Sequence, residues 1–201
     1  MAALTRRALL GATLAAAAPR AFAQAFTASA QHRLVLALAR ALLDRAGPEI
    51  WQRDVVALAD YSLPSSLPRL HFADLAGDRV HSFLVTHGKG SDPQHDGFCK
   101  TFSNAINSEA TARGAYVTYS WYEGKYGPSI RLGGLDPDNS NAAVRAIVMH
   151  PARYADPSML SRFGKLGRSD GCFAMAPGDF ANALWHLSPG RLLYADKLGL
   201  G

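Results

Sequence analysis

Two short apolar runs, each joined to a reactive side chain, constrain the fold of this chain more than any other feature. The run Ala146–Met149 leads directly to His150, and Phe173–Met175 directly follows Cys172. Short apolar runs are typical of buried strands, so each reactive side chain is expected at the end of a strand. A histidine and a cysteine held in this way suit thiol acyl transfer, in which a thiolate attacks a carbonyl carbon and the imidazole accepts and later returns the proton.

The turn before the cysteine gives a second indication. Gly171 directly precedes Cys172 and, because it lacks a side chain, is expected to leave room beside the sulfur for a carbonyl group. Backbone N–H groups of these two residues are expected to hold the oxyanion that forms during attack. A cysteine in an apolar strand is also an ordinary small buried hydrophobe, so the pattern around it decides between the two interpretations.

That pattern resembles the catalytic domain of the L,D-transpeptidase (YkuD-type) family. The signature of the family is a histidine followed, later in the chain, by Ser/Thr-His-Gly-Cys. Here His150 is followed by Ser-Asp-Gly-Cys at residues 169–172. Asp170 stands where the family usually has a second histidine, which resembles a divergent branch of the family. The resemblance runs from Thr86 to Tyr194.

The resemblance implies a single mainly β domain with flanking helices, built on a mixed β-sheet or sandwich. It also implies a peptidoglycan L,D-transpeptidase, in which Cys172 attacks an L,D peptide bond of a tetrapeptide stem, expels the terminal D-alanine and passes the acyl group to an amine of a second stem. Capture of the acyl group by water would instead make an L,D-carboxypeptidase. A non-catalytic wall-binding module is a third interpretation, which the Asp170 replacement favours. This chemistry requires no organic cofactor and no metal.

Further site residues are expected around this pair. In the resembled family a backbone carbonyl near the histidine orients the imidazole, which implies the carbonyl of Pro151 or Ala152 here. Ser169 and Asp170 are alternative orienting groups beside Gly171. The candidates for binding the substrate are His87, which precedes a glycine-rich loop, and the basic side chains Arg168, Lys125 and Arg131. Lys125 and Arg131 could hold a peptide carboxylate through charge-assisted hydrogen bonds, or they could be ordinary surface charges.

Two other interpretations compete for parts of the site. Nitrogen and oxygen donors in the loop 87–96, namely His87, Asp92, His95 and Asp96, could bind zinc in a peptidase, although their spacing matches no strong zinc motif. Cys99 and Cys172 could form a disulfide if the protein is exported to an oxidising compartment. A disulfide would mask the nucleophile.

Residues 1–23 are expected to be an export signal. Paired arginines at positions 6 and 7 precede an apolar core at residues 9–18, and Ala21-Phe22-Ala23 is a small-x-small cleavage site. The pattern resembles a twin-arginine signal, with the general secretory route as the alternative. We expect a periplasmic or cell-envelope protein without a membrane anchor after the signal is removed, because the apolar core is too short to span a bilayer.

The charge of the chain argues against nucleic acid as a partner. The whole chain carries 21 basic and 16 acidic side chains, for a net charge of +5, and three of the arginines lie in the expected signal. Without the signal the net charge is +2, with no concentrated basic stretch. Peptidoglycan stem peptides are the expected partners.

The remaining periodicity predicts the order of elements. A helical segment is expected within residues 24–49, centred on 31–45 with apolar residues at helical spacing, and a catalytic domain over 50–201. Strands are expected at 55–61, in a hairpin at 69–85, and at 115–122, 129–132 and 191–195. A helix is expected from Pro177 to Leu187, since proline favours the first turn of a helix.

Overall fold

The computed structural model describes residues 18–187 and 189–201, and it describes side chains from residue 30 onward with the same gap. Most of the expected export signal, residues 1–17, lies outside the described residues. The expected cleavage site at residues 21–23 lies in a helix, but the structure does not describe the side chains of this segment. In the described part of the chain, no helix combines the length and the apolar character needed to cross a membrane.

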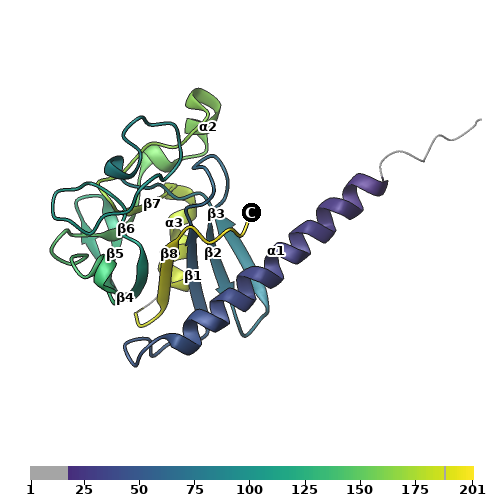
Figure 1. The fold of residues 1–201 in the computed structure, drawn as a ribbon, viewed down its shortest axis with the longest axis horizontal. Coiled ribbons are helices and arrows are strands. Elements are labelled where there is room, and N and C mark those ends of the chain that lie inside the picture. Colours follow the sequence, from purple (N-terminus) through teal and green to yellow (C-terminus); the bar gives the residue numbers. More distant parts are fainter. Residues whose placement is uncertain (1–17, 188) are drawn as a thin grey trace, which may run out of the picture.

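In the part of the chain that the structure describes, eight strands form one mixed sheet (Figure 1). They are β1 Val55–Asp60, β2 Leu70–Asp74, β3 Arg79–Phe83, β4 Gly114–Gly124, β5 Gly127–Gly134, β6 Val148–Pro151, β7 Phe173–Met175 and β8 Leu192–Asp196. Their order in the sheet is β3-β2-β1-β8-β4-β5-β6-β7. The pairs β1–β8 and β6–β7 are parallel, and all other neighbouring pairs are antiparallel.

Among the described residues, three α-helices flank this sheet: α1 Ala18–Arg45, α2 Ser158–Phe163 and α3 Pro177–His186. The described connections contain three short 3-10 helices: η1 Lys89–Ser91, η2 Pro137–Asn139 and η3 Arg153–Ala155. In Figure 1, α1 crosses β1–β3 on one face of the sheet, and α3 lies on the other face. Both faces of β1 are therefore covered, which explains why all six of its residues are buried.

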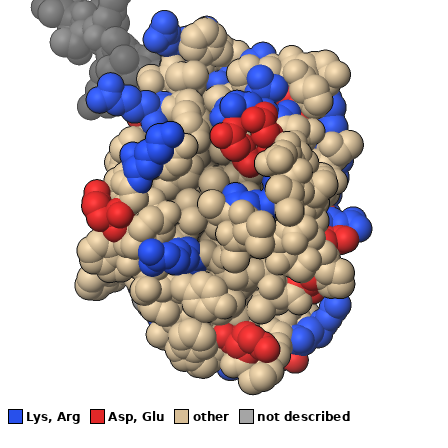
Figure 2. Space-filling view, turned by 90° about the vertical axis from the view of Figure 1, so that its left-hand side faces the viewer, with Lys and Arg blue, Asp and Glu red and all other residues tan. Residues whose placement is uncertain are grey.

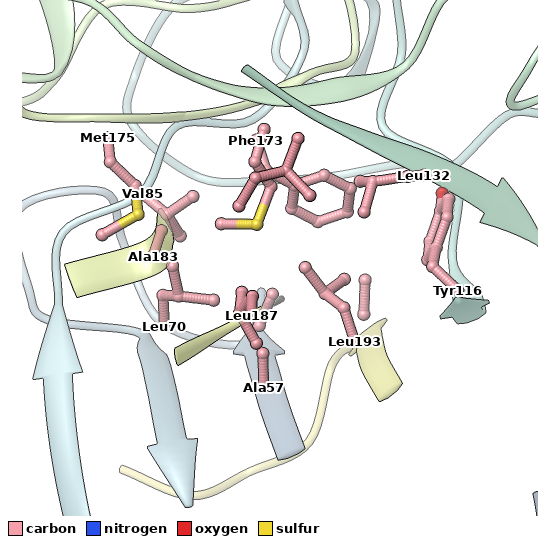
Figure 3. Packing of buried hydrophobic residues seen from close by; sticks show 14 of the residues in the cluster. Ala57, Leu70, Val85, Tyr116, Leu132, Phe173, Met175, Ala183, Leu187 and Leu193 are labelled. Carbon is pink, nitrogen blue, oxygen red and sulfur yellow. The ribbon is translucent and has the colours of Figure 1, made fainter. Parts of the chain in front are cut away.

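The main core lies on the α3 side of the sheet. It joins Leu70 and Phe72 from β2 to Met149 and Phe173 from β6 and β7, although these strands lie toward opposite ends of the sheet. The sheet must therefore curve around this cluster. Figure 3 shows the curvature: Phe173, Leu132 and Met175 lie on one side of the cluster, and Ala57, Leu70 and Leu193 lie on the other. A second cluster packs α1 against the opposite face of β1, β2, β4 and β8.

The structure confirms the predicted class, a mainly β single domain with flanking helices. It differs locally in three places. The helix expected at 31–45 begins already at Ala18, and the connection between His150 and Cys172, for which the sequence predicts no helix, contains α2. The strand that carries His150 begins at Val148, because Ala146 has a left-handed backbone (φ 52°) that a strand does not accommodate.

Candidate active site

His150 and Cys172 lie at one edge of the curved sheet, on the same face. In the parallel pair β6–β7, Met149 is opposite Phe173 and both side chains are buried in the main core. Since side chains alternate along a strand, His150 and Cys172 point to the other face. The register continues to place Cys172 opposite Val148, two residues before His150. The fold thus brings together the two reactive side chains expected from the sequence.

The imidazole of His150 is oriented by a backbone carbonyl. Its Nδ1 lies 3.0 Å from the carbonyl oxygen of Pro151, and because a carbonyl can only accept, Nδ1 carries the proton. This is one of the two carbonyls that the family resemblance implies. The other nitrogen, Nε2, makes no hydrogen bond to any described residue and is left to accept a proton.

Aromatic rings enclose this histidine. The ring of Tyr126, from the turn between β4 and β5, stacks on His150 with 4.5 Å between centroids, and Tyr154 meets it edge-on at 6.4 Å. Only 1% of His150 is exposed. Burial lowers its pKa, and the Pro151 hydrogen bond opposes that effect only in part. The imidazole is therefore neutral at neutral pH, as a general base must be.

Cys172 is a partly buried free thiol. Its Sγ contacts the carbonyl oxygen of Ala146 at 3.6 Å, and no hydrogen bond joins it to His150 among the described residues. Burial is the main cause that raises the pKa of Cys172, and the negative charge of Asp170 acts in the same direction. The Val148 backbone N–H and the cation of Arg145 oppose this rise. At rest the pair is a neutral thiol beside a neutral imidazole.

The turn before Cys172 is held by its own serine. Ser169 Oγ donates to the carbonyl oxygen of Cys172 at 2.6 Å and accepts from the N–H of Gly171 at 3.2 Å. The backbone of Ser169 also pairs with the loop after β3, accepting from Lys89 N–H at 2.8 Å and donating to the His87 carbonyl at 3.0 Å. The Gly171 N–H, one of the expected oxyanion donors, is therefore already engaged. The Cys172 N–H is the remaining candidate.

Gly171 has a different role from the one predicted. Its backbone is left-handed (φ 113°), and a Cβ there would lie 2.7 Å from the Ala110 carbonyl oxygen and 2.9 Å from Nη2 of Arg145. A glycine is needed because the backbone and a guanidinium approach so closely, rather than because space must stay open. Arg145 donates to the carbonyls of Ser103 and Ala110, which holds the cation beside the turn.

Two predicted neighbours of the nucleophile bind other groups. The carboxylate of Asp170 pairs with Nζ of Lys89 at 2.7 Å and its side chain is 60% exposed, so it does not orient His150. The guanidinium of Arg168 donates to the backbone carbonyls of Asp92 and Pro93. Arg168 thus ties the turn before Cys172 to the loop after β3, which is a structural contact rather than a free substrate-binding group.

The prediction that His87 lines a cleft is wrong, because the side chain is 1% exposed. Its Nδ1 accepts from the Arg69 guanidinium at 2.7 Å, and its Nε2 donates to Asp92 at 3.2 Å. Burial and the nearby positive charge of Arg69 lower the pKa of His87 to about 4. Arg69 is itself fully buried, donates to the Val85 and Leu63 carbonyls, and lies 4.9 Å over the ring of Tyr61. This buried chain of hydrogen bonds among Arg69, His87 and Asp92 stabilises the loop after β3.

The side chains considered as zinc ligands bind other partners. His95 contacts the Leu166 carbonyl at 3.0 Å, and Asp96 pairs with Lys100 at 2.6 Å. Across residues 18–187 and 189–201, no group of three or more His, Cys, Asp or Glu side chains is placed to hold one ion. Cys99, the partner in the disulfide alternative, is a buried free thiol in the main core.

The last two candidates, Lys125 and Arg131, belong to the β4–β5 hairpin. Lys125 is exposed in the turn, with Nζ 5.5 Å from the centre of the Tyr126 ring. Arg131 is exposed on β5 and pairs across strands with Val148, which places it on the same face as His150 and Cys172. Figure 2 shows the molecule from the side of β4–β6, with basic and acidic side chains interspersed rather than gathered in one patch.

Residues that the sequence did not single out complete the surroundings. Tyr126 and Tyr154 enclose the imidazole, Arg145 lies beside the turn, and Arg69 supports His87. One of them carried a local signal, since Tyr154 follows His150 closely in sequence. The others reach the site through strand pairing and loop packing over long sequence separations.

One protein family matches most of this chain. The profile of the L,D-transpeptidase catalytic domain matches residues 30–195, which include both reactive side chains. No curated protein sequence matches the chain.

Solved structures give more distant similarities. An L,D-transpeptidase from Mycobacterium smegmatis is 13% identical and covers 71% of this chain and 58% of its own, with a TM-score of 0.42. An LD transpeptidase solved in complex with imipenem is 12% identical and covers 71% of this chain and 59% of its own, with a TM-score of 0.42. An L,D-transpeptidase from Mycobacterium tuberculosis H37Rv is 18% identical and covers 71% of this chain and 57% of its own, with a TM-score of 0.38.

The chain thus spans less than two thirds of the length of these solved relatives. The family profile, in contrast, covers most of the chain itself. On that match, this chain belongs to the family of the L,D-transpeptidase catalytic domain.

Proposed function

We propose that this protein is a peptidoglycan L,D-transpeptidase that uses Cys172 as its nucleophile and His150 as its general base. The observation that supports this most is the pair at the sheet edge: a thiol and a neutral imidazole on one face, with the imidazole oriented by the Pro151 carbonyl and its Nε2 free. Membership in the family supports the reaction class.

The first half-reaction acylates the enzyme. Nε2 of His150 takes the thiol proton, and the sulfur attacks the carbonyl carbon of the L,D peptide bond in a tetrapeptide stem. The Cys172 N–H is the proposed donor to the oxyanion. The C–N bond then breaks, the imidazolium returns its proton to the leaving amine, and D-alanine departs with a thioester left on Cys172.

The second half-reaction transfers the acyl group. An amine of a second stem attacks the thioester carbon and loses a proton to His150, and the sulfur leaves and recovers that proton. If water attacks instead, the product is a shortened stem and the enzyme is an L,D-carboxypeptidase. On this proposal the protein acts in the cell envelope, where its substrate lies.

Incubation with purified tetrapeptide stems, followed by liquid chromatography and mass spectrometry, tests the proposal. We expect a cross-linked dimer that lacks one D-alanine, and no product from Cys172→Ala or His150→Ala. Tripeptide alone would contradict transfer and identify a carboxypeptidase. No product, together with unchanged binding of Cys172→Ala and wild type to sacculi, would identify a wall-binding module.

A further inference from the structure

The turn that carries Cys172 offers one backbone donor to an oxyanion. The Gly171 N–H is held by Ser169 Oγ at 3.2 Å, which leaves the Cys172 N–H. The carbonyl oxygen of Ala146, 3.6 Å from Sγ, can only accept a hydrogen bond and cannot support a negative oxygen. Oxyanion holes combine backbone and side-chain donors, including tyrosine hydroxyls. A side-chain donor beside the sulfur would therefore complete the site.

The cations nearest this turn are bound to other groups. Arg145 and Arg168 each donate to two backbone carbonyls. Lys89 pairs with the carboxylate of Asp170 at 2.7 Å. These three side chains hold the turn and the loop after β3 in place.

Tyr154, in contrast, has a hydroxyl that no described residue binds. It lies in η3, directly after the strand that carries His150, and its ring meets the imidazole edge-on at 6.4 Å. The side chain is only partly exposed. A partly buried hydroxyl without a protein partner is available to a bound ligand.

Backbone contacts fix Tyr154 against the segment that leads to the nucleophile. Its carbonyl oxygen accepts from the N–H of Gly167 at 2.7 Å. The two residues pack so closely that a Cβ on Gly167 would lie 2.6 Å from Cβ of Tyr154 and 3.1 Å from its Cγ. The tyrosine is thus held between the imidazole of His150 and the segment 167–172.

The phenol of Tyr154 is a donor at neutral pH. Burial is the main cause that raises its pKa, and the negative charges of Cys172 and Asp170 act in the same direction. The effect of Cys172 indicates that the hydroxyl and the sulfur lie in one site. A phenol that keeps its proton can donate to an oxyanion and does not compete with His150 as the base.

We propose that the hydroxyl of Tyr154 is the second donor to the oxyanion, beside the Cys172 N–H. As the sulfur attacks, an electron pair of the carbonyl group moves onto its oxygen, and the phenol donates a hydrogen bond to that oxygen while keeping its own proton. The inference rests on the proposed function and adds a catalytic residue to it.

Two small reagents, one of which forms an oxyanion, test the inference. In acylation by para-nitrophenyl acetate the C–S bond forms, the thiol proton passes to His150, and para-nitrophenolate leaves with the electron pair of the broken C–O bond. Alkylation by iodoacetamide displaces iodide and forms no oxyanion. In a Cys99→Ala background, Tyr154→Phe should slow acylation of Cys172 by about 10- to 100-fold and leave alkylation within about twofold.

Tyr194→Phe is the matched control. Tyr194 on β8 is also partly exposed, burial also raises its pKa, and no described residue binds its hydroxyl. This variant should leave both rates within about twofold. Unchanged acylation in Tyr154→Phe would overturn the inference. Equal slowing of both reactions would also overturn it, because it would show that the hydroxyl only supports the geometry of the thiol and the imidazole.

Turnover of tetrapeptide stems by wild type separates this inference from the proposed function. Selective slowing of acylation in Tyr154→Phe, without turnover of stems by wild type, would support the donor and contradict the proposed function. Turnover of stems by wild type, with full acylation in Tyr154→Phe, would do the reverse.

Discussion

At the scale of single residues, two opposite charges act on the thiol of Cys172. Asp170 raises its pKa and Arg145 lowers it, while burial is the main cause and raises it. The imidazole beside it is also kept neutral by burial. The sequence is equally compatible with a neutral pair and with a preformed thiolate–imidazolium pair, and the structure favours the neutral pair. Proton transfer then accompanies substrate binding rather than preceding it.

This arrangement predicts the pH dependence of thiol reactivity. In a Cys99→Ala background, alkylation of Cys172 by iodoacetamide should rise with pH through a single inflection above the ordinary thiol pKa of 9.0. Asp170→Asn should move the inflection to lower pH, and Arg145→Gln should move it to higher pH, whereas Arg145→Lys should move it less. A plateau of high reactivity at weakly acidic pH would reveal a preformed ion pair and contradict this account.

Gly171→Ala should destabilise the turn that carries the nucleophile. The left-handed backbone and the close approach of the Ala110 carbonyl leave no place for a Cβ, so we expect the free energy of unfolding to fall by about 1–3 kcal/mol. Gly178→Ala is the control, because a Cβ on that residue of α3 would meet nothing within 4 Å. It should change stability by less than about 1 kcal/mol, in the stabilising direction. Equal effects in urea unfolding would show that the contacts around Gly171 are not limiting.

At the scale of elements, the β4–β5 hairpin covers the site. Its turn carries Tyr126 onto the imidazole, and its strands carry Tyr122 and Arg131 to a hollow that Ala146 and Val148 also line. The turn before Cys172 and the loop after β3 form a second pair of elements, joined by backbone hydrogen bonds of Ser169 and by Arg168. The candidate nucleophile is therefore held by one pair of loops and the candidate base by a hairpin.

Removal of the hairpin cover should change the base more than the nucleophile. In Tyr126→Ala the imidazole of His150 gains solvent, so its lowered pKa should rise toward the ordinary value of 6.5. Tyr126→Phe preserves the stacked ring and should leave the pKa unchanged. Titration of the His150 ring by NMR measures both variants. An unchanged pKa of His150 in Tyr126→Ala would show that other groups exclude water from the ring.

At the scale of the whole molecule, the buried chain of Arg69, His87 and Asp92 links stability to pH. Between pH 6.5 and about 4 the unfolded chain protonates this histidine and the folded chain does not, so stability is lost as pH falls through that window. The loss attributable to His87 is about 3 kcal/mol. Urea unfolding at a series of pH values should show a flatter dependence for His87→Gln than for wild type.

His32→Gln, at an exposed position of α1, should keep the wild-type dependence. If His87→Gln does not fold, NMR titration of the His87 ring in wild type gives the same information. A ring that titrates near 6.5 in the folded protein would contradict the linkage.

Features that depend on local sequence could be predicted, whereas contacts between distant segments could not. Apolar runs and a family motif are local, and they predicted most strands, α3 and the placement of His150 and Cys172 at strand ends. The contact of Arg69 with His87 and the stacking of Tyr126 on His150 depend on strand pairing between distant segments. Local periodicity contains no information on such pairing.

The incorrect predictions for two residues have the same cause, namely contacts with distant segments. His87 was predicted to face a substrate because a glycine-rich loop follows it, yet its side chain is buried and contacts the guanidinium of Arg69, the residue before β2. Gly171 was predicted to open space, yet Arg145 and the Ala110 carbonyl fill that space. A residue next to a motif can be assigned to it only when the segments packed against it are known.

The most direct test of the central claim, that Cys172 is an activated acyl-accepting thiol, is an intact mass measurement after incubation with the carbapenem imipenem. Opening of a β-lactam ring by a thiolate adds the whole drug without a leaving fragment. We predict a mass increase of one drug in wild type and in Cys99→Ala, and no increase in Cys172→Ala. Absence of an adduct in protein shown to carry free thiols, or an adduct that persists in Cys172→Ala, would contradict this account.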